Sequence, residues 1–327
     1  MVVLRWNLEI VKGEPQRFAD CKRRCSCVFH MIRHPEFLLH RQGPSHSAAT
    51  NSNTFPNNAL CCTDEDKQVK WILFAPSSGA GAVMPLTDDS PLARKLSAFV
   101  ALSDPEFAVL ASLHERRKFF TAGRDLVHQG QSAQAVYILA SGWVCSYKIQ
   151  SDGSRQIIDV QIPGDFLGLR SVLLRTSDHS FEPITDIQAA EVYAADLLTA
   201  FADTPRLATA IFWAASRDEA MVVEHLVNVG HRDAEARVAH FLLELGARLA
   251  LVGMGNRDAY DCPLTQYHLA DALGLSAVHA NRVLRKLRER GLVTFRDGRV
   301  SIHDHENLAD LAKFDIEYLD QDGPLLK

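Results

Sequence analysis

A basic cluster near the C-terminal end of the chain offers the clearest chemistry in this sequence. Between Ala277 and Arg299, seven lysine and arginine residues stand against two acids, Glu289 and Asp297. Guanidinium and ammonium groups bind phosphate oxygens, and an arginine fork can also pair with the edge of a guanine. The cluster therefore predicts contact with nucleic acid, although a basic helix that only faces solvent has a similar composition.

The elements that must position these side chains favour nucleic-acid binding. We predict a short helix over residues 267–273 and a second helix over residues 277–290. Gly274 lies between them, where a positive φ costs glycine little. The pair Asp297-Gly298 then predicts a hairpin. Helix, turn, helix and hairpin make up the winged helix-turn-helix, a double-stranded DNA-binding motif.

The geometry of this motif divides its polar residues into two groups. The N-terminal half of the second helix enters the major groove, whereas helix N-termini and the wing hold phosphates. Arg282 could pair with guanine and Asn281 with adenine. The predicted base-reading residues are His279, Asn281, Arg282 and Arg285. The predicted DNA-backbone contacts are Thr265, Gln266, Tyr267, Ser276, Arg296 and Arg299.

The region upstream predicts a β-rich domain followed by a long helix. Glycines recur every 4 to 12 residues between Gly123 and Gly168, which predicts an antiparallel barrel or sandwich of about eight strands closing near residues 189–196. The helix predicted over residues 207–230 has a nearly heptad apolar pattern, so it could pack on its own barrel or on its twin in a dimer. The candidate dimer residues are Ile211, Ala215, Val222, Leu226 and Val229.

Residues 1–83 differ from the rest of the chain. Much of this segment is rich in Ser, Asn and Pro and has too few apolar residues to offset the entropy of ordering. We expect it to be disordered, or to be a wrongly assigned extension ahead of a true start at Met84. Its cysteines Cys21, Cys25 and Cys27 are the candidates for a metal site.

Composition excludes several other classes of protein. The 327 residues are 47% hydrophobic, enough for two domains and an appendage. The sequence shows neither a signal peptide nor an apolar run of about 18 residues, so we expect a cytoplasmic protein without membrane contact. A net charge of −5 argues against a general coat on nucleic acid. A P-loop, a nucleophile elbow and an HExxH motif are all missing, so we expect no enzyme.

The order of these parts resembles the Crp/Fnr superfamily of bacterial transcription regulators, closer to its Fnr and FixK side. The resemblance covers about residues 95–320 and rests on "PGDFLG", "SGWVCSYKIQSDGSRQI" and "LTQYHLADALGLSAVHANRVLRKL". It implies an α+β fold with an N-terminal antiparallel β-roll of the cyclic-nucleotide-binding kind, a long dimerisation helix and a C-terminal winged helix-turn-helix. The corresponding domains are 84–205, 206–230 and 231–327.

The resemblance also implies a function. A member of this superfamily acts as a homodimer on a palindromic DNA site, and we expect this chain to be an activator that works with RNA polymerase. Members often place glutamate at the start of the base-reading set, but Val278 stands there in this chain. The usual half-site is therefore not assumed, and we expect His279 and Asn281 to carry part of the discrimination.

The ligand sets of the superfamily are incomplete in this sequence. Members that bind cyclic nucleotides carry Gly-Glu and then Arg-Ser, where this chain has Gly168-Leu169 and His179-Ser180. Fnr holds an iron–sulfur cluster with three N-terminal cysteines and one in the β-roll, but residues 189–196 contain no cysteine. We therefore predict no cofactor, neither cyclic AMP nor a cluster. The alternative is a redox or metal sensor that uses the N-terminal cysteines.

Overall fold

The computed structural model describes residues 8–11, 59–63, 69–74, 86–87, 89–132 and 135–319. The chain divides into two units, Met1–Val83 and Met84–Lys327. In the first unit, where we expected no regular structure, three strands form one sheet in the order β1-β3-β2. They are β1 (Leu8–Val11), β2 (Ala59–Thr63) and β3 (Val69–Phe74). Cys21, Cys25, Cys27 and Met84 lie outside the described residues.

The second unit begins with α2 (Pro91–Ser97) and α3 (Asp104–Leu113). A β-roll follows them. Its two antiparallel sheets have the orders β4-β10-β5-β8 and β7-β6-β9. Their strands are β4 (Arg117–Phe120), β5 (Val136–Ser141), β6 (Val144–Ile149), β7 (Arg155–Gln161), β8 (Phe166–Leu167), β9 (Ser180–Pro183) and β10 (Ile187–Val192). A short 3-10 helix, η1 (Ser171–Leu173), follows β8. The last strand closes the roll where the sequence predicted, with seven strands in place of about eight.

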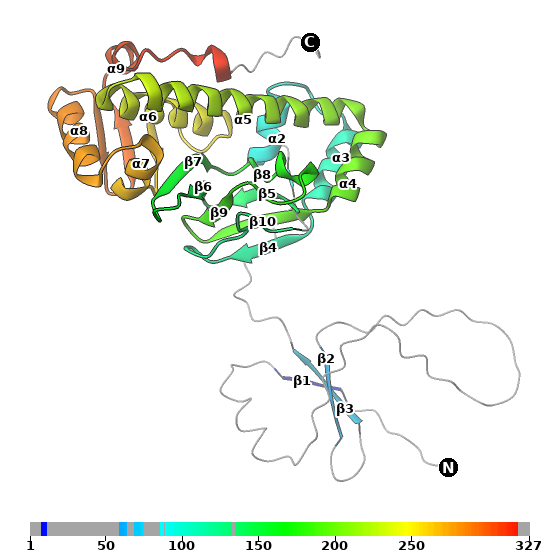
Figure 1. Ribbon diagram of the computed structural model, residues 1–327. Helices are drawn as coiled ribbons and strands as arrows, with labels where there is room; N and C mark the ends of the chain where they lie inside the picture. Colours follow the sequence, from blue (N-terminus) through cyan, green and yellow to red (C-terminus); the bar gives the residue numbers. More distant parts are fainter. Residues whose placement is uncertain are drawn as a thin grey trace, which may run out of the picture. The chain divides into compact units, whose positions relative to one another are not determined.

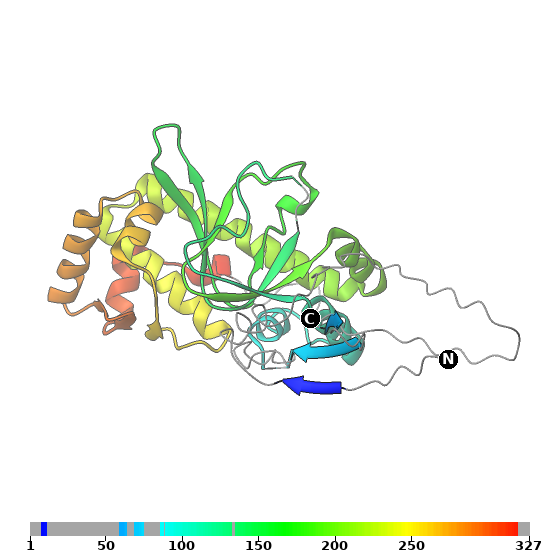
Figure 2. The same ribbon diagram turned by 90° about the horizontal axis from the view of Figure 1, so that it is seen from below.

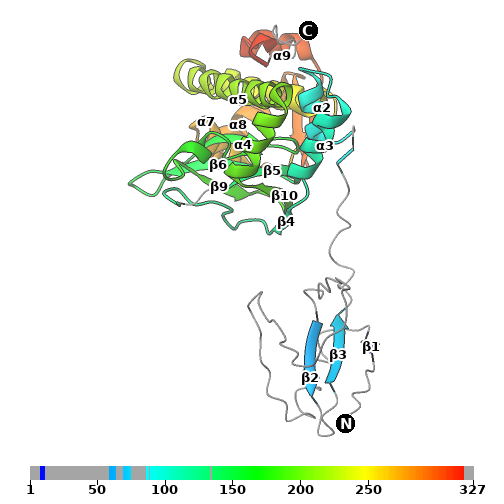
Figure 3. The same cartoon turned by 90° about the vertical axis from the view of Figure 1, so that its right-hand side faces the viewer.

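Three consecutive helices lead away from the roll: α4 (Ala194–Asp203), α5 (Pro205–His231) and α6 (Ala234–Leu251). The long α5 ends where Arg232 becomes extended, and the Asp233 side chain caps α6 by accepting from the Ala236 amide. Figure 3 shows α5 between the β-roll and the C-terminal segment. None of the helices in the described part of the chain combines the length and apolar character that a membrane span requires.

The C-terminal region is a winged helix. It contains β11 (Ala259–Asp261), α7 (Gln266–Leu273), α8 (Ala277–Glu289), β12 (Val293–Arg296), β13 (Arg299–Ile302), α9 (His305–Ala312) and η2 (Ile316–Leu319). The sheet order β11-β13-β12 adds one strand, β11, to the predicted hairpin. In Figures 1 and 2, α7 and α8 lie at one end of α5, and α3 and α4 lie at the other.

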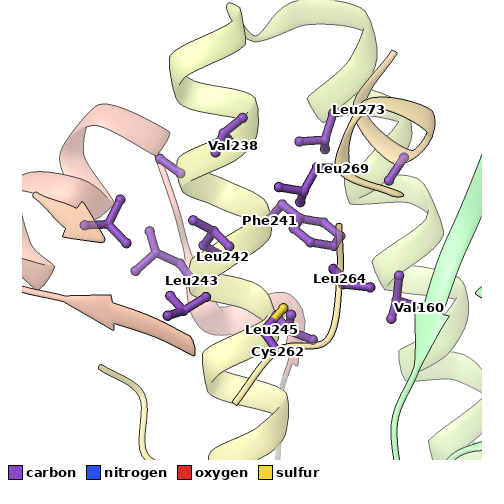
Figure 4. Close-up of a cluster of buried hydrophobic side chains, with 14 of the residues drawn as sticks. Val160, Val238, Phe241, Leu242, Leu243, Leu245, Cys262, Leu264, Leu269 and Leu273 are labelled. Carbon is purple, nitrogen blue, oxygen red and sulfur yellow. The ribbon is translucent and has the colours of Figure 1, made fainter. Parts of the chain in front are cut away.

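The β-roll and the winged helix share one apolar core. Cys145 and Val160 of the roll belong to the same buried cluster as Phe241 and Leu245 of α6. Figure 4 shows Val160 on its strand together with Phe241, Leu242 and Leu245. The β-roll and α6 are therefore packed against each other.

A buried network of charges crosses the same boundary. Arg248 of α6, only 3% exposed, donates to Asp159 at 3.1 Å, to Asp165 at 3.0 Å and to the Val160 carbonyl at 2.8 Å. Lys95 of α2 reaches the other oxygen of Asp165 at 2.8 Å. Burial alone would raise the pKa of Asp165, but the charges of Lys95 and Arg248 outweigh it and hold that pKa at about 2.

The C-terminal segment ties α5 to α6. The Arg217 guanidinium of α5 donates to the Leu319 carbonyl at 3.3 Å, and the Tyr318 hydroxyl donates to Glu244 of α6 at 2.7 Å. Leu308 is fully buried and Phe314 packs against the shared core. The contact with α5 was not predicted, because it joins segments about 100 residues apart.

The carboxyl of Glu244 should make stability depend on pH. Burial raises the pKa of Glu244 from 4.5 to about 7, against the opposing charge of Arg248. The folded state therefore holds this proton more tightly than the unfolded chain, so the stabilisation is complete below about pH 4.5 and is lost as the pH rises through 7. Between pH 5 and 8 the free energy of unfolding of the wild type should fall by about 2 kcal/mol relative to Glu244→Gln.

Urea unfolding of both proteins across this pH range measures the difference. Other titrating groups, including Asp218, are common to both proteins, so the comparison isolates Glu244. Parallel curves for wild type and Glu244→Gln would contradict the assignment.

Candidate nucleic-acid interface

Two caps and one turn build the helix-turn-helix as predicted. The Thr265 hydroxyl accepts from the His268 amide, and the His268 ring accepts from the Thr265 amide, so α7 begins one residue earlier than expected. Gly274 ends α7 with a φ of +63°. The Ser276 hydroxyl then accepts from the His279 amide and caps α8. Thr265 and Ser276 therefore hold the motif together through their side chains, whatever they contribute toward phosphate.

The second helix has one buried face and one free face. Ala280, Val283 and Leu287 enter the core of the winged helix. The exposed residues Val278, Arg282 and Arg285 follow at intervals of four and three on the opposite side. In the described part of the chain, neither Arg282 nor Arg285 has a hydrogen-bond or ion-pair partner. His279 and Asn281 are also exposed, and each flanks this row on one side.

Two cations farther along α8 are already engaged. Lys286 and Arg290 contact the two oxygens of Glu235 on α6, at 2.5 and 3.1 Å. Their contacts position α8 on α6 and partly offset their charge. Both residues lie toward the C-terminal end of α8, outside the predicted base-reading set.

The predicted backbone contacts are exposed at two places. Gln266 and Tyr267 lie at the start of α7. Arg296 and Arg299 flank the wing turn, where Asp297 and Gly298 adopt φ values of +52° and +71°. Arg299 pairs with Asp261 at 3.0 Å across the sheet, so this cation would have to exchange a partner to reach a phosphate.

An ion pair between the roll and α7 was missed by the sequence reasoning. Arg155 of β7 contacts Asp271 of α7 at 3.0 Å and Glu182 of β9 at 3.2 Å. The neighbouring Gln156 side chain donates to the Ala272 carbonyl at 3.1 Å. These contacts fix the orientation of the helix-turn-helix on the roll. No local pattern could have revealed pairs that are about 116 residues apart.

One of the candidate dimer residues on α5 lies in the core of its own chain, and its predicted role is therefore wrong. Ile211 is 1% exposed and packs in the core of its own β-roll, because it lies on the inner face of α5. Ala215 and Val222 are half-buried and line an internal cavity. Leu226 is 72% exposed, and Val229 is half-buried. The apolar residues that α5 leaves in solvent are Phe212, Val223, Leu226 and Val227.

Comparison with known proteins identifies the family of the chain. Residues 236–311 match the Crp-like helix-turn-helix domain, and residues 117–204 match the cyclic nucleotide-binding domain. The chain is 30% identical over 182 residues to the nitrogen fixation regulation protein FixK of Rhizobium meliloti, covering 55% of this chain and 79% of that protein. The chain belongs to the Crp/Fnr family.

Two further relatives agree with this assignment. The Crp/Fnr chain is 30% identical over 187 residues to a probable transcriptional activator of Rhizobium leguminosarum, covering 57% of this chain and 76% of the relative. The structure of FixK2 from Bradyrhizobium japonicum superposes with a TM-score of 0.54 at 26% identity, covering 60% of this chain and 96% of FixK2. This Crp/Fnr protein is a DNA-binding transcription regulator and not an enzyme.

A small cavity of this Crp/Fnr protein lies between α5 and the β-roll. Its volume of about 40 Å³ holds about three waters. Leu169 lines it at the position expected for the glutamate of cyclic-nucleotide-binding members, and the charged residues of the lining are Asp159, Asp165, Arg170 and Asp218. His179 is 2% exposed beside Asp178, and burial lowers the pKa of His179, which disfavours the charged form of the ring that a phosphate would require. Leu169 and His179 stand where the sequence predicted the ligand set to be incomplete.

Cys145 and Cys262 of this Crp/Fnr protein are free, fully buried thiols. Burial raises the pKa of each to about 12. Because the thiolate is the reactive form, iodoacetamide at pH 8 should leave both unmodified in the folded protein and label them after unfolding in urea. Peptide mapping by mass spectrometry measures this. Rapid labelling of Cys145 in the folded protein would show an accessible, reactive thiol.

Proposed function

We propose that this Crp/Fnr protein acts as a homodimer on a palindromic DNA site and activates transcription through RNA polymerase. The observation that carries the proposal is the free face of α8, where Arg282 and Arg285 are exposed and without partners in the described part of the chain. A capped N-terminus and the contacts of Lys286 and Arg290 to α6 hold this face outward. The name of the relative from Rhizobium leguminosarum supports activation.

The free face of α5 supports the dimer. Phe212 and Leu226 are each 72% exposed, and Val223 lies between them on the same side of the helix. Exposed apolar residues aligned along a helix favour pairing with another apolar surface. Pairing α5 with its twin by a two-fold axis would place two copies of α8 on one side of the dimer. Two such helices fit half-sites about 34 Å apart, one turn of DNA.

Sedimentation of the full chain and of Leu226→Asp tests the dimer. We expect the wild type to be a dimer at micromolar concentration and the variant to be a monomer, because aspartate would be buried against its twin without a partner. Leu198→Asp is the matched control, since Leu198 is an exposed leucine (61%) on a different helix, α4. A monomeric wild type, or a dimeric Leu226→Asp, would overturn the α5 pairing.

We further propose that DNA binding requires neither cyclic AMP nor an iron–sulfur cluster. The apolar Leu169, the lowered pKa of His179 and the small cavity support the first part. The second part is supported by residues 189–196, where the superfamily places its fourth cluster ligand and this chain has no cysteine.

Anaerobic purification of the full chain, with absorbance, metal analysis and selection of sites from random DNA, tests both parts. We expect colourless, metal-free protein that selects one palindrome, with unchanged affinity on addition of cyclic AMP. Coloured protein whose DNA binding is lost with its metal would favour the alternative, a redox or metal sensor using Cys21, Cys25 and Cys27.

A further inference from the structure

The free face of α8 contains an apolar residue at its centre. Val278 is 69% exposed, although it belongs to a winged helix whose other aliphatic side chains on α8 are buried or half-buried. It lies four residues before Arg282 and seven before Arg285, so the three form one row opposite the buried Ala280, Val283 and Leu287. A β-branched residue on an exposed helix surface gains nothing from packing and has below-average helix propensity.

The neighbours of Val278 leave it no role within its own chain. The cap of α8 is complete without it, because the Ser276 hydroxyl takes the His279 amide. The first turn of α8 contains no acidic residue. A carboxylate acceptor for the amino group of cytosine is therefore missing from the part of the helix that enters the groove first.

The chemistry of a valine in this position is specific. Its two methyl groups neither donate nor accept hydrogen bonds, so the groove feature that they can recognise is another apolar group. In the major groove of DNA that group is the 5-methyl of thymine, which alkyl side chains contact directly. We propose that Val278 reads a thymine methyl in each half-site and thereby sets a preference for thymine at one position.

This inference rests on the proposed function, since it requires α8 to lie in the major groove. It goes further by assigning a base and an atom to one residue. Arg282 and Asn281 discriminate through hydrogen bonds, whereas Val278 discriminates through burial of a methyl group, and deleting that methyl group from the DNA isolates its contribution.

Deoxyuridine, which lacks only the 5-methyl group, supplies the test. Sites are first selected from random DNA with the full-length wild type, and each thymine of the half-site is then replaced in turn by deoxyuridine. Affinity is measured by fluorescence anisotropy at fixed salt. At one position we expect binding to weaken about fourfold per half-site, and about 15-fold when both half-sites are changed.

The variant Val278→Ser removes the methyl groups from the protein side of the contact. Serine has no methyl groups, so the variant should bind thymine and deoxyuridine equally at that position, while Leu198→Ser should retain the preference of the wild type. Val278→Glu should change the selected base at the same position, because a carboxylate accepts from cytosine. Circular dichroism establishes that each variant is folded.

The outcomes separate this inference from the proposed function. A wild type that selects no DNA sequence overturns both. A wild type that selects a palindrome, yet binds it equally well with deoxyuridine at every thymine, overturns only the role of Val278. A deoxyuridine effect of equal size in wild type and Val278→Ser assigns the methyl contact to another residue and also overturns it.

Discussion

Replacing Arg282 by alanine should lower the affinity for the selected site by at least about 30-fold and relax its sequence preference. A bidentate arginine–guanine pair contributes about 1–3 kcal/mol of discrimination, and a dimer would lose two such pairs. Arg282 is exposed on the free face of α8 and has no partner in the described part of the chain, so its removal does not disturb the fold. Anisotropy titrations with the selected site and with a scrambled site measure both effects.

Arg288→Ala is the matched control, since it removes the same exposed side chain from the same helix. A phosphate contact acts on every sequence alike, so this variant should weaken binding to both sites by the same small factor and reduce the salt dependence. If Arg282→Ala behaves like Arg288→Ala, the arginine at 282 holds phosphate and does not read a base.

Replacing Arg248 by methionine should lower the free energy of unfolding by about 3–5 kcal/mol. The buried guanidinium is shared by Asp159, Asp165 and the Val160 carbonyl. Without it, Asp165 keeps the ion pair to Lys95 and the Ile162 amide, and Asp159 loses the ion pair to α6. Methionine fills a similar volume but leaves the buried Asp165 and the half-buried Asp159 without sufficient counter-charge, which is costly in a low dielectric.

Urea unfolding at pH 7, followed by circular dichroism, measures this loss. Arg299→Met is the control, because Arg299 and Asp261 form an exposed pair that should contribute at most about 1 kcal/mol. A loss of less than about 1 kcal/mol in Arg248→Met would mean that water or the remaining cation compensates the two carboxylates.

Sequence reasoning was most successful where the structure depends on near neighbours. Thr265, Gly274 and Ser276 each act within three or four residues of their own position, so the helix-turn-helix that they stabilise could be predicted from residue type and spacing. The order of roll, long helix and winged helix also followed from local periodicity, and the comparisons confirm it.

It was least successful where one residue serves a distant partner. An apolar pattern on α5 cannot show whether Ile211 faces its own roll or another chain, and the structure buries it in the roll. The acid Asp218, which interrupts that pattern, lies 3.5 Å from Lys95, more than 100 residues earlier in the chain. Such pairs depend on the tertiary arrangement, and a single sequence contains no record of it.

The core that α6 shares with the β-roll limits how this protein could be divided or recombined. A fragment that begins after α5 would carry Phe241 and Leu245 without Val160 and Cys145, and Arg248 without Asp159 and Asp165. Exchange of the winged helix between relatives would therefore have to include the matching strand residues. We expect a graft of the helix-turn-helix alone to lose the core and ion-pair contacts that position it on the roll.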